Sequence, residues 1–233
     1  MTLKVDVDIG DTTTGVMMPA QNSTSPLQDP QITAVLDRLR AESRRPAGGG
    51  PRGGADTRDP HAYADIGFSI HADQGDLIYL LCRAIAATRV VEFATSVGVS
   101  TIYFAAAVRD NGGGKVIGSE IVPEKAATAQ RNLAEAELDK YVDLRVGDAR
   151  ETLRDLGGPV DFALIDGWPI SDGGPTPARQ VIEIVAPQLR TGAFVMNDNA
   201  EPDHLDYIRD PANGFRSVTL PLKGSTELSV KVS

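Results

Sequence analysis

The chain has 233 residues, which is enough for one well-packed domain with additional segments but short for two domains. Apolar residues make up 41% and charged residues 24%, as in ordinary globular proteins, and no segment approaches the ~18 consecutive apolar residues of a membrane helix. The formal net charge of -9 argues against a nucleic-acid partner, because a nucleic-acid surface needs a basic stripe. The N-terminus does not have the basic start and apolar run of a signal peptide, and the single cysteine cannot form an internal disulfide, so a cytoplasmic location is expected.

The first 60 residues differ in composition from the rest, and we expect them to form an extension to a domain that covers residues 61–233. Within this extension, residues 4–9 alternate apolar and charged side chains as an edge strand would, and such a strand could pair with a second copy to make a homodimer. Helical spacing of apolar residues predicts a short amphipathic helix over 29–45, and the glycine-rich residues 46–56 predict a loop or linker.

From about Ala72 onward, helical and strand patterns alternate. They predict helices over 73–87, 100–110, 123–138, 149–156 and 176–189, strands over 89–93, 115–120, 142–147, 160–166 and 192–198, and an antiparallel hairpin within 215–232. Short apolar strands that alternate with helices indicate an α/β fold with a mostly parallel sheet and helices on both faces. In such sheets ligands bind at the carboxyl ends of the strands.

Acidic residues stand at the ends of the five predicted strands before the hairpin, namely Glu92, Glu120, Asp148, Asp166 and the "NDN" of 197–199. A carboxylate at the end of the second strand can accept hydrogen bonds from a ribose diol, in nicotinamide enzymes and methyltransferases alike. An acid at the end of the third strand favours a methyltransferase, because it can accept a hydrogen bond from an adenine amino group. The first turn, "EFATSVGVST", does not carry the three glycines of a dinucleotide fingerprint, which disfavours a nicotinamide-dependent oxidoreductase.

The segments "VVEFATSVGVST", "VIGSEIVPEKA", "VGDARETL", "ALIDGW" and "VMNDNA" occur in the order found in a known family. With them the chain resembles the class I S-adenosylmethionine-dependent O-methyltransferases of the catechol O-methyltransferase type, above all their small bacterial relatives. The resemblance runs from about Ser69 to the C-terminus. It implies a Rossmann-like class I methyltransferase fold, with a mostly parallel seven-stranded sheet and a C-terminal antiparallel hairpin.

The resemblance also implies roles for individual residues. Glu92 lies beneath the methionine moiety of S-adenosylmethionine, Glu120 holds the ribose hydroxyls, and Asp148 flanks the adenine, against which Trp168 packs unless it is a plain core aromatic. The full cofactor-binding set consists of Ser69, Ile70, Glu92, Ala94, Gly98, Ser100, Glu120, Ile121, Gly147, Asp148, Ala149, Asp166 and Trp168.

Asp166, Asp198 and Asn199 match the family's ligands for a divalent metal. Their hard oxygen atoms suit Mg²⁺, and no cluster of histidine and cysteine favours zinc. The ion would bind two neighbouring oxygens of a small hydroxylated acceptor, either a catechol-like ring or a natural-product intermediate, and would lower the pKa of the attacking hydroxyl.

Two positions depart from the family pattern. Ala94 replaces a usual glycine, and at a positive φ an alanine costs ~1–2 kcal/mol. Pro169 stands where family members commonly have a lysine that acts as general base, so no catalytic residue is assigned. Candidate bases are Asp172, His204 and His71, although each histidine is more simply a surface or capping residue.

The sequence therefore favours a metal-assisted O-methyltransferase for a small acceptor. One alternative is a metal-independent small-molecule methyltransferase. Another is a cofactor-binding protein of the same fold with weak or no catalysis, because Ala94 and Pro169 both depart from the family pattern. The acceptor, the general base and the oligomeric state do not follow from the sequence.

Overall fold

The computed structural model describes residues 25–43, 59–167, 173–198 and 200–233. The predicted strand at 4–9, the glycine-rich segment 46–56 and the residues Trp168, Pro169, Asp172 and Asn199 lie outside these ranges.

The centre of the fold is a seven-stranded sheet with the strand order β3-β2-β1-β4-β5-β7-β6. Its strands are β1 (Arg89–Phe93), β2 (Lys115–Glu120), β3 (Val142–Val146), β4 (Val160–Ile165), β5 (Leu189–Asp198), β6 (Phe215–Leu220) and β7 (Thr226–Lys231). The first five strands are parallel, whereas β7 runs antiparallel to both β5 and β6. The predicted mostly parallel sheet with a C-terminal antiparallel hairpin is confirmed.

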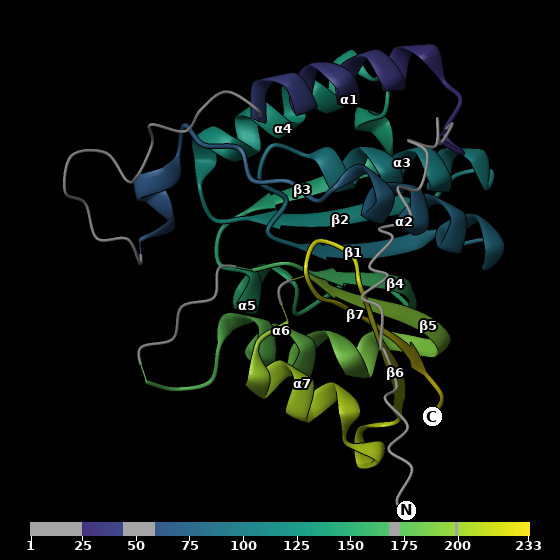
Figure 1. Ribbon diagram of the computed structural model, residues 1–233, viewed down its shortest axis with the longest axis vertical. Helices are drawn as coiled ribbons and strands as arrows, with labels where there is room; N and C mark the ends of the chain where they lie inside the picture. The colour runs from purple at the N-terminus through teal and green to yellow at the C-terminus, as the bar shows by residue number, and fades with distance from the viewer. Residues whose placement is uncertain (1–24, 44–58, 168–172, 199) are drawn as a thin grey trace, which may run out of the picture.

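Helices cover both faces of the sheet (Figure 1). One face carries α1 (Pro30–Ser43), α2 (Ala72–Ala84), α3 (Val99–Asp110) and α4 (Pro123–Glu135), and the other carries α5 (Ala149–Thr152), α6 (Pro177–Val185) and α7 (Pro202–Arg209). Short 3₁₀ helices span Pro60–Tyr63, Asp139–Tyr141, Ala186–Gln188 and Pro211–Asn213. None of these helices, within the ranges described, is both long and apolar enough to cross a membrane.

The two faces of the sheet are packed into separate cores. Val90 of β1 belongs to the core under α1 to α4, and its neighbour Val91 belongs to the core under α5 to α7. Successive side chains of a strand point to opposite faces, so a strand that is buried on both sides reads as a continuous apolar run. This is why the "RVVEF" pattern predicts β1 with its exact limits.

Helix α1 packs on the same core as α2 and α3 through Ile32, Val35, Leu36 and Leu39. Polar contacts fix it further, because Arg38 bonds to Glu135 of α4 at 2.6 Å. The helix of the N-terminal extension is therefore joined to the domain by apolar burial as well as by ion pairs.

Several helices end before their predicted limits: α2 and α4 end three residues early, and α5 and α6 end four residues early. Helix α5 ends at Thr152 instead of continuing to 156. The Arg145 guanidinium donates hydrogen bonds to the backbone carbonyls of Thr152 and Asp155, at 2.6 and 2.7 Å, in place of further helical N–H groups. Helix α7 was not predicted at all. Only His204 and Ile208 are buried among its eight residues, so its apolar periodicity is too weak to be recognised.

Candidate functional site

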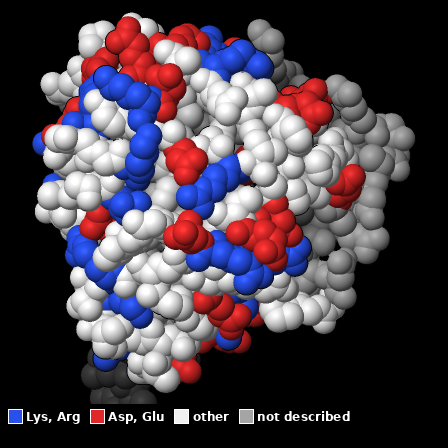
Figure 2. All heavy atoms as spheres, turned by 180° about the vertical axis from the view of Figure 1, so that it is seen from behind, with Lys and Arg blue, Asp and Glu red and all other residues white. Residues whose placement is uncertain are grey.

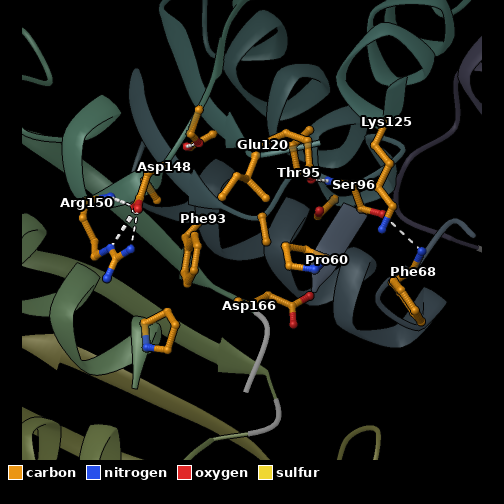
Figure 3. A pocket seen from close by; sticks show the side chains of 18 of the residues that line it. Pro60, Phe68, Phe93, Thr95, Ser96, Glu120, Lys125, Asp148, Arg150 and Asp166 are labelled. Carbon is orange, nitrogen blue, oxygen red and sulfur yellow. Dashed lines mark hydrogen bonds and ion pairs between the residues drawn. The ribbon is translucent and has the colours of Figure 1, made fainter. Parts of the chain in front are cut away.

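A cavity of about 890 Å³ opens at the carboxyl ends of the parallel strands (Figure 3). Ten of the predicted cofactor residues line it: Ser69, Ile70, Ala94, Ser100, Glu120, Ile121, Gly147, Asp148, Ala149 and Asp166. They come from the segment before α2, from the ends of β1, β2, β3 and β4, and from the first turns of α3 and α5. The structure therefore brings together side chains that are separated by as many as 97 residues of sequence, because parallel neighbours end at one edge of a sheet.

Among the described residues predicted to bind the cofactor or the metal, Glu92, Gly98 and Asp198 do not line the cavity. Glu92 is fully buried below it, where the hydroxyls of Thr95 and Thr101 donate to its Oε2 at 3.0 and 2.6 Å. Burial raises the pKa of Glu92 above its usual range, although these hydroxyl groups oppose the shift. Gly98 begins α3 at a φ of +90°, and an added Cβ would lie 3.2 Å from the Cβ of Ala129, so its role is close packing of α3 against α4.

Glu120 holds the two turns that border the cavity. Its carboxylate accepts the backbone N–H of Ser96 at 2.7 Å and that of Val122 at 2.8 Å. Lys125 of α4 lies beside this site with its ammonium 4.7 Å from the centre of the Phe68 ring. Burial lowers the pKa of Lys125, and the negative charge of Glu120 opposes this shift.

The backbone of the turn after β1 is left-handed at Ala94, the position where the sequence departs from the family's glycine. Ala94 has a φ of +70°, and its N–H donates to the carbonyl of Ser119 at 3.0 Å. Ser96 in the same turn has a φ of +52°. The chain therefore places L-residues in left-handed backbone where glycine would be free of strain, at ~1–2 kcal/mol each.

Asp148 and Arg150 form one wall of the cavity (Figure 3). The Asp148 carboxylate caps α5 by accepting the Arg150 N–H at 2.9 Å, and it also accepts the guanidinium Nε of Arg150 at 2.9 Å. The hydrogen bonds from Arg150 lower the pKa of Asp148, although partial burial opposes them. The guanidinium of Arg150 also donates a hydrogen bond to Oε1 of Gln180 at 3.0 Å, so the charged pair is held in a fixed orientation.

Asp166, directly after β4, and Asp198, the last residue of β5, lie at neighbouring strand ends. Ile165 of β4 pairs with Asn197 of β5, so the next residue in each strand is an aspartate on the same face. Asp166 faces the cavity, where burial and the charge of Asp198 raise its pKa to about 7, with Lys223 opposing. Asp198 lies behind it, only 1% exposed.

Asp198 is held by side chains from two other elements. Its Oδ1 accepts the amide of Gln74 at 2.9 Å, and its Oδ2 pairs with the ammonium of Lys223. No group of three histidine, cysteine or acidic side chains suited to a metal ion occurs in the part of the chain that the structure describes.

The candidate bases occupy different surroundings. His204 lies fully buried in α7, outside the cavity lining, and burial lowers its pKa to about 4, so the ring is neutral near pH 7. His71 is exposed at the N-cap of α2, also outside the lining, and its backbone N–H donates to Gln74 at 2.8 Å. His71 therefore has the capping position that the sequence makes the simpler interpretation, whereas His204 is a buried residue and not the surface or capping residue that was expected.

Sequence reasoning missed several residues that line the cavity: Phe68, Phe93, Lys125, Arg150, Gln180 and Lys223. Arg150 and Lys125 follow strand ends by only four and five residues and could have been found by including each following helix turn. Lys223 had no such signal, because it lies in the turn between β6 and β7.

Comparisons with known proteins agree with this architecture. A family profile described as a methyltransferase domain matches residues 91–200. A catechol O-methyltransferase of Niastella koreensis is 31% identical over 139 residues, which cover 58% of this chain and 59% of that protein. A catechol O-methyltransferase of Mycobacterium tuberculosis is 39% identical over 99 residues, which cover 42% of this chain and 44% of that protein.

The fold is also shared with solved structures. An O-methyltransferase from Bacillus cereus in complex with S-adenosylhomocysteine superposes with a TM-score of 0.61 at 20% identity, covering 87% of this chain and 91% of that one. At this level of identity the likeness concerns the fold. Residues 91–200 thus match a methyltransferase domain profile, the chain shares its fold with a solved O-methyltransferase, and it is similar to two catechol O-methyltransferases over 58% and 42% of its length.

Proposed function

We propose that the chain is an S-adenosylmethionine-dependent O-methyltransferase that methylates a hydroxyl of a small acceptor. The observation that carries the proposal is Glu120, whose carboxylate lines the cavity and is held by two backbone N–H groups. A carboxylate fixed in this way can accept hydrogen bonds from both hydroxyls of a ribose through its remaining lone pairs. Asp148, at the end of the next strand, is the corresponding acceptor for an adenine amino group.

The cavity fits this cofactor in size and chemistry. Its volume of about 890 Å³ is within the ~300–1,000 Å³ of small-molecule sites. Phe93 and Ile121 supply apolar surface for the nucleoside, and Ser69 and Ser100 supply hydroxyls for the amino-acid end. When bound, the cofactor would supply an electrophilic methyl group to an acceptor oxygen, with S-adenosylhomocysteine and the hydroxyl proton as the other products.

The protein's own contribution is positioning. Residues on four strand ends can hold the cofactor and the acceptor in one cavity, and well-oriented reactants gain up to ~7–11 kcal/mol over free ones. We further propose a catechol-like acceptor, which the names of the two curated relatives support.

A divalent metal does not fit the described donors. The ammonium of Lys223 already pairs with Oδ2 of Asp198, and its positive charge would repel a second cation at this carboxylate, whose Oδ1 accepts the Gln74 amide. Asp166 would offer one carboxylate, and Asn199 is outside the described residues. The proposed reaction therefore includes no step on the ion that the resemblance implies.

Calorimetry with S-adenosylhomocysteine, followed by mass spectrometry of a panel of catechols and other hydroxylated acceptors, tests the proposal. We expect saturable cofactor binding and the mass gain of one methyl group on an acceptor. Binding without turnover across the panel would instead support a cofactor-binding protein, and tight NADH binding would support an oxidoreductase.

A further inference from the structure

Lys223 is a cation in the wall of the cavity. It lies in the turn between β6 and β7, lines the cavity, and has a φ of +45°, which is rare for a residue with a long side chain. Its side chain remains 23% exposed while that of its partner Asp198 is fully buried. The ammonium therefore sits between a buried anion and the open cavity.

The carboxylate under Lys223 is fixed by a buried network. Gln74, which is itself fully buried, donates from one amide nitrogen to Asp198 and to Thr226, both at 2.9 Å. The Thr226 hydroxyl in turn donates to the carbonyl of Leu222 at 3.0 Å. Because Leu222 precedes Lys223, the network that orients Asp198 also holds the turn that carries the ammonium.

The charges around this position are uneven. Burial raises the pKa of Asp166, and so do the negative charges of three neighbouring carboxylates, those of Asp198, Glu92 and Glu201. The positive charge of Lys223 lowers it. An ammonium has three N–H donors, and the pair with Asp198 requires one of them. The others can reach a ligand on the cavity side.

We propose that the ammonium of Lys223, held on Asp198, is the cation that binds the acceptor oxygens in this chain, at the place which the family resemblance gives to a divalent metal. The inference rests on the proposed O-methylation. Lys223 would donate hydrogen bonds to the hydroxyl oxygen that attacks and would stabilise the negative charge that develops there. Preorganised donors of this kind are typically worth ~10²–10³ in rate.

This arrangement has a consequence for the acceptor. A metal ion selects two adjacent oxygens because both enter its coordination shell, whereas an ammonium can act on one. The acceptor class therefore includes phenols with a single acidic hydroxyl as well as catechols.

The test uses the full chain and two independent readouts. Binding of Mn²⁺ is followed by electron paramagnetic resonance, and methylation is measured with and without chelator. Wild type is expected to bind no Mn²⁺ that depends on Asp198 and to keep its activity in chelator. Lys223→Met should lower kcat/KM at least ~100-fold with unchanged affinity for S-adenosylhomocysteine, and Lys223→Arg, which keeps the charge, should retain more activity.

Lys140→Met is the matched control, because Lys140 is exposed and outside the cavity lining, and it should behave as wild type. A Mn²⁺ site that appears in Lys223→Met would support the proposal directly. Mn²⁺ binding to wild type that is lost in Asp198→Asn would overturn it, as would activity abolished by chelator and restored by Mg²⁺. If no acceptor is methylated at all, the proposed function fails. The comparison of Mn²⁺ binding in wild type and Asp198→Asn would still show whether Asp198 holds a metal ion or the Lys223 ammonium.

Discussion

Gly167 lies directly against the ring of Phe93: a Cβ at Gly167 would stand 1.8 Å from Cε1 of Phe93 and 2.2 Å from Cζ. Phe93 ends β1, Gly167 follows Asp166 after β4, and both line the cavity. The glycine thus allows an aromatic wall and an acidic strand end to meet with no side chain between them.

Replacing Gly167 by alanine should disturb this contact. The methyl group would force Phe93 or the end of β4 to move, at a cost of ~1–3 kcal/mol, and should weaken binding of S-adenosylhomocysteine. Denaturant unfolding and calorimetry measure the two effects. Gly174→Ala is the control, since Gly174 lines the same cavity with nothing within 4 Å of its added Cβ and no positive φ. Equal effects of the two substitutions would contradict this explanation.

Ala94→Gly should tighten cofactor binding. It removes left-handed strain of ~1–2 kcal/mol and a methyl group that lines the cavity, while the greater freedom of the unfolded chain takes back ~0.5–1 kcal/mol. Stability should therefore rise by about 1 kcal/mol or less, and calorimetry should show stronger binding of S-adenosylhomocysteine. Ala86→Gly is the matched control, because Ala86 has a φ of +51° at an exposed position outside the cavity lining. This substitution should change the stability and leave binding of S-adenosylhomocysteine unchanged. Weaker binding by Ala94→Gly would show that the alanine is adapted to the cofactor.

Glu120→Gln should weaken binding of the cofactor. The amide nitrogen of glutamine would face a backbone N–H, and the charge that accepts ribose hydroxyls would be lost. Hydrogen bonds to charged groups contribute ~1.5–3 kcal/mol, so the dissociation constant of S-adenosylhomocysteine should rise ~10–100-fold. Glu124→Gln, exposed on α4 and outside the cavity lining, should bind as wild type. An unchanged constant for Glu120→Gln would remove the main support for the cofactor assignment.

The buried His204 should make stability depend on pH. Burial lowers its pKa to about 4, whereas in the unfolded chain it titrates near its ordinary ~6.5. The unfolded state therefore binds more protons between these values, and stability falls as the pH falls through this window. Between pH 7 and pH 5 the loss from this group is roughly 2 kcal/mol.

Glu201 has the opposite effect on the pH dependence of stability. Burial raises its pKa to about 7, so the folded state binds more protons than the unfolded state below this pH. The stability that this group contributes is lost as the pH rises from the unfolded pKa toward 7. The measurement must therefore compare wild type with His204→Leu by urea unfolding at both pH values. The variant should gain roughly 2 kcal/mol relative to wild type at pH 5 compared with pH 7. Parallel pH profiles for the two proteins would exclude this role for His204.

Much of the fold could be predicted because its signals are local. The apolar runs of β1, β2 and β4 reflect burial on both faces, and Pro123 marks the start of α4 at the first helical position. The strand-end residues Glu120 and Asp148 could be assigned to one site because parallel strands end together. Helix α7 could not, since its burial rests on two residues.

The sequence by itself determined the alternation of strands and helices and the acidic residue at each strand end, because periodicity and parallel pairing depend on short-range order. Only the tertiary structure decided which cation meets Asp198. Lys223 lies 25 residues further along the chain, and it reaches the end of β5 because β7 returns antiparallel beside that strand. No local pattern encodes that approach, which depends on how the last hairpin pairs with the sheet.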